Sequence, residues 1–212
     1  EPDPTGSLDL AIGDSADGTL LAVTVMPGPQ LEQALPVCRE LKRRHPELTV
    51  VWGGYFPSRH WEACVRDPAI DYVVRGHGEH VFAQLVDFLS TGSPARENIL
   101  SLAFAGSDGL ARTGAQAPIP KPADMPDWNI DLVDMPRYLR RTFLGERTVG
   151  YHSSYGCPFR CNFCAVVNLV QGRWLAQPAE RVANVVRSWH HRWGVDAVEM
   201  YDNNFFVHEE RV

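Results

Sequence analysis

The chain has 212 residues, a formal net charge of −6, and 44% hydrophobic residues, so it is long enough for one large domain or two small ones. The negative balance, without an arginine-rich strip, disfavours nucleic acid as the main partner. No apolar run approaches the roughly 20 residues that cross a bilayer, and no signal-peptide pattern opens the chain, so no membrane association is predicted.

The first half of the chain alternates strand and helix patterns. Its opening segment, Glu1–Gly18, is rich in Pro, Asp, Gly and Ser, which predicts a loop. Strands are predicted at Leu20–Met26, Thr49–Trp52 and Ile70–Val74, and helices at Leu31–His45, at 58–65 with Ser58 as its cap, and at Val81–Leu89. This alternation predicts an α/β fold with a doubly wound parallel sheet that has helices on its faces.

Three stretches begin at the ends of these strands. They are Thr24–Met26, Gly53–Ser58 and Arg75–Glu79, and the last two are rich in glycine. Ligands of such sheets bind beyond the carboxyl ends of the strands, and glycine lets the backbone approach a bulky ligand closely. Each glycine stretch could also simply form a tight turn between a strand and a helix.

Together the three stretches resemble the cobalamin-binding domain that precedes many radical S-adenosylmethionine (SAM) domains. That family has a W-G-G-x-x-P-S/T turn and a D-x-V-V-x-G-x-G-E strand and turn, and the match covers about Leu20 to Gly92. The domain is expected to be incomplete at its N-terminal side. The resemblance implies that cobalamin contacts Thr24, Met26, Gly53, Gly54, Phe56, Pro57, Gly76, Gly78 and Glu79.

The lower axial ligand of the cobalt stays open. Another type of corrinoid protein carries a D-x-H-x-x-G motif whose histidine binds cobalt, and this chain has no such motif. His45 and His60 are expected to face solvent. His77 lies inside a glycine turn and is the weaker candidate for a ligand.

A hairpin and a stiff segment follow the first half. Ile99–Phe104 and Leu110–Arg112 flank a glycine-containing turn, which predicts a small β-hairpin. Four prolines interrupt 117–134, which predicts an extended linker. We therefore predict a cobalamin-binding domain at 1–95, the hairpin and linker at 96–142, and the start of a barrel at 143–212.

The last part has a strand–helix–strand pattern. Thr148–Ser153 is predicted to be a strand, a helix opens at Gln177–Glu180 and closes at Gly194, and Ala197–Tyr201 is the next strand. Such a unit is how a (β/α) barrel begins, and reactive groups of barrels collect at the carboxyl ends of their strands.

Three of the five cysteines lie between these strands with the spacing C-x-x-x-C-x-x-C: Cys157, Cys161 and Cys164. Three thiolates on one loop suit a [4Fe–4S] cluster that keeps one iron open. A structural zinc ion is the main alternative, although it would need a fourth ligand such as His152. A disulfide is disfavoured, because three neighbouring cysteines cannot all pair.

This loop resembles the cluster motif of the radical SAM superfamily, including Phe163 before the third cysteine. The resemblance implies that Cys157, Cys161 and Cys164 bind the cluster, and that SAM is held by Phe163 and by Asp202, Asn203 and Asn204. The two asparagines could instead only shape a turn. The three sulfurs are expected to converge on one point.

The whole pattern resembles cobalamin-dependent radical SAM enzymes. It implies a methyltransferase that acts on an unactivated carbon, or on phosphorus, through a 5′-deoxyadenosyl radical and methylcobalamin. A small-molecule substrate, a one-electron donor such as flavodoxin or ferredoxin, and a reducing cytoplasm fit this chemistry. Alternatives are a non-methylating cyclase or rearrangement enzyme of the same family, and a corrinoid-binding module with a non-catalytic metal site.

Two further expectations concern the arrangement. The glycine turns are expected to line one cleft that faces the cysteine loop. The residues after Cys164 leave room only for the N-terminal part of a barrel, so we expect weak or no turnover from residues 1–212 alone.

Overall fold

A computed structural model of the chain describes residues 3–109, 111–164, 166–170 and 172–212. The chain forms two compact units, Glu1–Ile119 and Pro120–Val212, and each is described by itself. This division groups the predicted hairpin with the first sheet; Leu110, in one predicted hairpin strand, lies outside the described residues. In the described part, no helix is long and apolar enough to cross a membrane.

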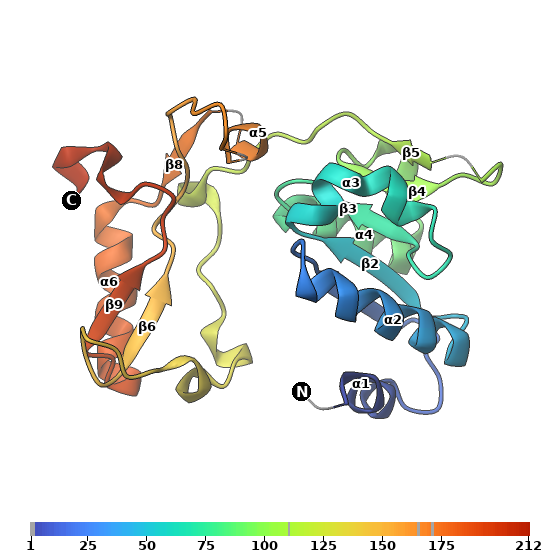
Figure 1. The fold of residues 1–212 in the computed structure, drawn as a ribbon, viewed down its shortest axis with the longest axis horizontal. Coiled ribbons are helices and arrows are strands. Elements are labelled where there is room, and N and C mark those ends of the chain that lie inside the picture. Colours follow the sequence, from blue (N-terminus) through green and yellow to red (C-terminus); the bar gives the residue numbers. More distant parts are fainter. Residues whose placement is uncertain (1–2, 110, 165, 171) are drawn as a thin grey trace. The chain divides into compact units, whose positions relative to one another are not determined.

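The first unit is a mixed α/β sheet with helices, as Figure 1 shows. Its strands are β1 (Leu20–Thr24), β2 (Thr49–Gly53), β3 (Tyr72–Val74), β4 (Leu102–Ala105) and β5 (Ala111–Thr113). Its helices are α1 (Pro4–Ile12), α2 (Pro29–Arg44), α3 (Tyr55–Val65) and α4 (Glu79–Thr91), with a 3-10 turn at Arg96–Asn98. Within the described residues the strand order is β1-β2-β3-β4-β5; β1 to β3 are parallel, and β4 and β5 add antiparallel strands.

Successive residues of β2 point to opposite faces of the sheet, because the side-chain period of a strand is two. Val50 and Trp52 are buried in the core that α2 and α3 cover, together with Leu41 of α2. Val51 lies in the core on the other face, where α4 contributes Leu85. Helices therefore cover both faces of the sheet, which confirms the predicted α/β class.

Two helices differ from the prediction. The opening segment forms α1, because the Asp3 carboxylate accepts a hydrogen bond from the Gly6 N–H (2.9 Å) and caps the helix. Leu8 and Ile12 pack against the first core, so the predicted loop was wrong. Helix α3 begins at Tyr55 after Gly54, not at a Ser58 cap.

The second unit contains the predicted strand–helix–strand pattern (Figure 1). Its elements are β6 (Thr148–Tyr151), β7 (Ser154–Gly156), α5 (Val166–Val170), β8 (Trp174–Ala176), α6 (Ala179–Trp193) and β9 (Ala197–Met200), with 3-10 turns at Pro122–Asp124, Ile130–Leu132, Met135–Tyr138, Phe205–Val207 and Glu209–Arg211. Strands β6 and β9 pair in parallel from Thr148↔Ala197 to Tyr151↔Met200. Val149, Tyr151 and Trp189 of α6 are buried together in its core.

A second small sheet, β7 with β8, was not predicted. These three-residue strands are antiparallel, with Ser154 opposite Ala176 and Gly156 opposite Trp174. Strand β7 follows β6 and leads directly into the cysteine loop, and β8 follows the loop and α5.

Candidate functional site

The first candidate site is the carboxyl edge of the first sheet. Strands β1, β2 and β3 are parallel, so the turns that follow them share one edge. The Val25 N–H donates to the Gly53 carbonyl (2.9 Å), and the Phe56 N–H donates to the Val25 carbonyl (3.2 Å). These bonds fasten the turn after β1 to the turn after β2.

Gly54 and Gly76 are among the glycines of these turns that have positive φ, which disfavours any other residue. At Gly54 (φ 92°) an added Cβ would lie 2.9 Å from the Thr24 methyl group and 3.2 Å from the Val25 nitrogen, so close packing also requires glycine. At Gly76 (φ 72°) no heavy atom lies within 4 Å of the place that a Cβ would take. The backbone at Gly76 is therefore open, and this bare turn fits a bulky cofactor such as cobalamin.

The Ser58 hydroxyl links two of the turns. It donates to the Gly54 carbonyl (2.6 Å) and accepts a hydrogen bond from the Gly76 N–H (2.8 Å). Ser58, which the sequence predicted to be a helix cap, thus holds the turn after β3 against the turn after β2.

The other residues predicted to bind cobalamin lie in or beside the same turns. Met26 is 45% exposed, whereas the Pro57 side chain is fully buried. Gly53 ends β2, and Gly78 precedes the first turn of α4, where its carbonyl accepts from the Phe82 N–H (2.7 Å). The structure brings these residues to one edge, and their contact with cobalamin stays a prediction.

Glu79 begins α4 beside two histidines. His77 Nδ1 lies 4.0 Å from Glu79 Oε1, and the interaction with this ring lowers the pKa of Glu79 despite the opposing effect of burial. Glu79 is therefore a carboxylate at neutral pH, at the helix N-terminus where negative charge is stabilised.

The second candidate site is the cysteine loop, which lies between β7 and α5. Gly156 ends β7 with φ 81°, and a Cβ there would collide with the Arg173 carbonyl, so only glycine fits at the entry to the loop. Cys161 is exposed, and Cys157 and Cys164 are half-buried. All three thiols are outside the hydrophobic cores of the described residues, and none is in a disulfide.

The expected convergence of the three sulfurs is not seen. No group of three or more His, Cys, Asp or Glu in the described part of the chain is arranged to hold a metal ion. Loops of metal sites gain much of their order from the metal, which explains why a short loop does not gather its thiols by itself. The donor set, three accessible thiols on one loop, still fits a cluster with an open iron.

Residues after β9 contact the segment that enters the loop. The Asp202 carboxylate accepts from the Ser153 N–H (3.0 Å) and from the Ser153 hydroxyl (2.8 Å), and also from the Ser154 hydroxyl. Asn203 Oδ1 accepts from the Gly156 N–H (3.1 Å). The prediction that these residues, with the 88% exposed Phe163, contact SAM is untested by this arrangement.

Arg211 was not identified as a site residue from the sequence. Its guanidinium donates to the Ser153 carbonyl (2.9 Å) and the Gln177 carbonyl (3.1 Å), and it lies over the Trp174 ring. Trp174 in turn donates to the Ser154 hydroxyl (3.1 Å) and the Asn204 carbonyl (3.1 Å). No local signal could have revealed Arg211, because its partners are distant in the sequence.

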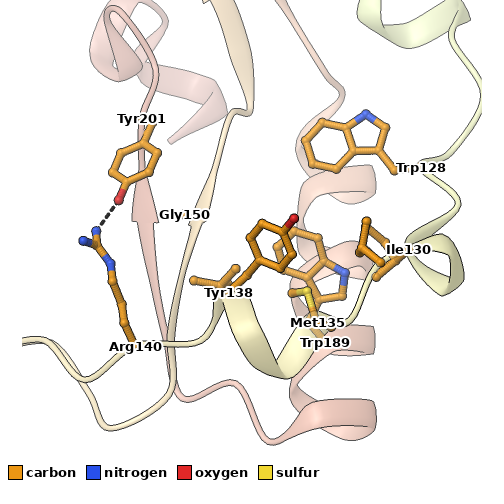
Figure 2. A pocket seen from close by; sticks show the side chains of 10 residues that line it. Trp128, Ile130, Met135, Tyr138, Arg140, Gly150, Trp189 and Tyr201 are labelled. Carbon is orange, nitrogen blue, oxygen red and sulfur yellow. Dashed lines mark hydrogen bonds between the residues drawn. The ribbon is translucent and has the colours of Figure 1, made fainter. Parts of the chain in front are cut away.

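A hollow of about 440 Å³ also lies in the second unit, beside β6 (Figure 2). Trp128, Tyr138 and Trp189 form much of its aromatic wall, and Arg140 donates to the Tyr201 hydroxyl in the same view. A Cβ at Gly150 would collide with the Tyr201 ring, so this glycine makes room for that ring. Arg140 is also paired with Glu199.

Comparison with known proteins adds the family context. Residues 8–86 match the B12 binding domain family. The chain is 30% identical over 211 residues to an uncharacterised methyltransferase of Pyrococcus horikoshii, covering 96% of this chain and 45% of that protein. It is 30% identical over 172 residues to the anaerobic magnesium-protoporphyrin IX monomethyl ester cyclase of a Synechocystis species, covering 79% of this chain and 34% of the cyclase. The chain thus spans less than half the length of these curated relatives.

Solved structures share the fold. The cobalamin-dependent SAM radical enzyme OxsB with aqua-cobalamin bound superimposes with a TM-score of 0.72 at 19% identity, over 95% of this chain and 28% of that chain. The radical SAM methyltransferase TsrM from Kitasatospora setae, with tryptophan substrate and a SAM analogue bound, gives 0.70 at 20% identity, over 99% of this chain and 41% of that chain. At this identity the likeness concerns the fold alone.

Proposed function

Because this chain belongs to the cobalamin-dependent radical SAM family, we propose that it methylates an unactivated carbon, or phosphorus, of a small-molecule substrate. One observation supports the proposal most: the same chain contains a glycine turn with an open backbone at the carboxyl edge of the first sheet, at Gly76, and a loop with three free cysteines. Among its relatives, the one from Pyrococcus horikoshii is described as a methyltransferase.

Cobalamin would be held at the carboxyl edge of the first sheet. The bare backbone at Gly76 leaves room for a large ring, and the Ser58 hydroxyl and Gly54 keep the neighbouring turns in place. These groups are backbone and small side chains, which suits recognition of a bulky cofactor by shape.

Cys157, Cys161 and Cys164 would hold the [4Fe–4S] cluster, with SAM beside it. When bound, these cofactors supply the radical and methyl-transfer chemistry, while the chain positions them and keeps water away. The cluster needs an electron, for which a flavodoxin or ferredoxin is the proposed donor. A location in the reducing cytoplasm would keep the three thiols free.

A second candidate function is a cyclase that transfers no methyl group. The observation that favours it is the 30% identity with the anaerobic cyclase of the Synechocystis species. Both functions require the same cofactors, so only the product separates them.

The test is anaerobic reconstitution of the chain with iron, sulfide and hydroxocobalamin, followed by iron and sulfide analysis and absorption spectroscopy. We expect labile sulfide and bound cobalamin. Zinc without labile sulfide would contradict the radical SAM assignment, because zinc sites contain no sulfide. Because we expect weak or no turnover from residues 1–212 alone, the reaction is tested in a longer polypeptide that includes them. SAM with a deuterated methyl group is supplied, and label in the product identifies methyl transfer, whereas an unlabelled cyclised product would favour the second candidate.

A further inference from the structure

The paired strands β6 and β9 are tied together at both ends by an aspartate. Asp196 directly precedes β9, and its carboxylate accepts from the Glu146 N–H (3.1 Å) and the Arg147 N–H (2.9 Å), just before β6. Asp202 follows β9 and accepts from the Ser153 N–H (3.0 Å), just after β6. Each aspartate therefore binds backbone N–H groups next to β6, Asp196 at one end of the strand pair and Asp202 at the other. Only Asp202 lies at the end that leads to the cysteine loop.

The bonds of Asp202 occupy most of its carboxylate. Oδ2 accepts from the Ser153 N–H, and Oδ1 accepts from the hydroxyls of both Ser153 and Ser154. Both serines are buried, with 0% and 1% of their surfaces exposed. Breaking these bonds to contact a ligand would leave buried donors without partners, which is costly.

The next two residues continue the same contact. Asn203 Oδ1 accepts from the Gly156 N–H (3.1 Å), and Asn204 Nδ2 lies 4.0 Å from the Cys157 sulfur. Three consecutive residues after β9 thus meet the entry segment 153–157, up to the first cysteine.

We infer that Asp202 and Asn203 are positioning residues that clamp the entry segment and thereby set the place of Cys157. This inference rests on the proposed function for the meaning of Cys157 as a cluster ligand. It assigns Asp202 a structural task on the chain instead of the contact with SAM that its position after the strand suggested.

The first experiment compares Asp202→Asn with Asp196→Asn in the chain. An amide has one acceptor oxygen and no charge, so it cannot accept from the Ser153 N–H and from both hydroxyls together, and the bonds that remain lose the strengthening effect of the negative charge. After anaerobic reconstitution, we expect Asp202→Asn to lose iron and sulfide to a chelator about tenfold faster than the unchanged chain. This factor corresponds to the free energy of about one hydrogen bond to a charged group. Asp196→Asn should lose them at the unchanged rate.

A second readout does not depend on the cluster. In the reduced, metal-free chain, iodoacetamide labelling is followed for each cysteine by mass spectrometry. Freeing the entry segment should raise the labelling rate of half-buried Cys157 about threefold or more, because labelling follows local opening. Exposed Cys161 should change little, and Asp196→Asn should leave Cys157 as it is.

The outcomes separate the two hypotheses. If the unchanged chain takes up no cluster, the proposed function fails, while the labelling of Cys157 still decides the clamp. If Asp202→Asn keeps its cluster and its slow labelling but loses the SAM-induced change in the electron paramagnetic resonance spectrum, Asp202 contacts SAM and the clamp is refuted. Should Asp202→Asn fail to fold by circular dichroism, Ser153→Ala removes only the hydroxyl donor to Asp202, and labelling of Cys157 equal to that of the unchanged chain in that variant overturns the inference.

Discussion

At the scale of single residues, the two glycines Gly76 and Gly92 provide a matched pair. Both have positive φ (72° and 77°), and no heavy atom lies within 4 Å of an added Cβ at either. Alanine at either place therefore costs a similar left-handed backbone strain, about 1 kcal/mol. Gly92 ends α4, far along that helix from the turn that contains Gly76.

We predict that Gly76→Ala weakens cobalamin binding about tenfold or more, because its methyl group enters the space proposed for the cofactor. Gly92→Ala should bind as the unchanged chain does, although urea unfolding should show a comparable loss of stability. Affinity is measured by titration of hydroxocobalamin with absorption spectroscopy. Equal affinities of the two variants would place the cofactor elsewhere.

The lowered pKa of Asp202 predicts that stability depends on pH. Burial by itself raises the pKa of this carboxyl, but the hydrogen bonds from Ser154 and Ser153 outweigh it, so the pKa lies below its ordinary value of 3.8. A lowered folded-state pKa means that the folded state binds the proton less readily than the unfolded state. The contribution to stability is therefore complete above the ordinary carboxyl pKa and is lost as the pH falls through the lowered value.

We expect the second unit to lose stability as the pH falls through this range, and Asp202→Asn to lose less, because an amide does not titrate there. Thermal unfolding between pH 2 and 5, followed by tryptophan fluorescence, checks this. An identical pH slope in the variant would show that Asp202 contributes nothing to acid sensitivity.

At the scale of elements, Ser58 of α3 joins the turn after β2 to the turn after β3. Ser58→Ala should cost about 1 kcal/mol of unfolding free energy, since the Gly76 N–H and the Gly54 carbonyl both lose a partner. It should also weaken cobalamin binding, because the Gly76 turn is no longer fixed. Ser58→Thr keeps the hydroxyl and should restore both the stability and the cobalamin affinity. If Ser58→Ala binds cobalamin normally and Ser58→Thr does not restore the stability, the hydrogen bonds of the Ser58 hydroxyl play no part in cobalamin binding.

The elements also show what the sequence could predict. The buried strands and the glycine turns were predictable, because apolar runs and Gly pairs are local signals. Helix α1 was missed because its Pro, Gly and Ser content resembles a loop, while the Asp3 cap that starts it depends on a side-chain bond. Strands β7 and β8 are three residues long and form only by pairing with each other. The place of Asp202 after a strand could be predicted, whereas its bonds to Ser153 and Ser154 depend on the pairing of β6 with β9.

At the scale of the whole chain, the residues proposed for the two cofactors fall into different units. Those proposed for cobalamin all lie in Glu1–Ile119, and the three cysteines lie in Pro120–Val212. A ligand stabilises what it binds by RT ln(1 + [L]/Kd), which at 100 times Kd is about 2.7 kcal/mol. Cobalamin should therefore raise the unfolding free energy of the first unit and leave that of the second unit unchanged.

We predict that hydroxocobalamin at 100 times its Kd slows amide hydrogen exchange of the core amides of β1, β2 and β3 up to about 100-fold, where exchange requires unfolding of that unit. Amides of β6 and β9 should exchange as before, because their unit contributes none of the proposed contacts. Mass spectrometry of peptic peptides from the intact chain measures both in one experiment. Gly76→Ala at the same cobalamin concentration should show much less slowing, which ties the effect to the glycine edge. Slower exchange confined to β6 and β9 would place cobalamin in the second unit and contradict the assignment.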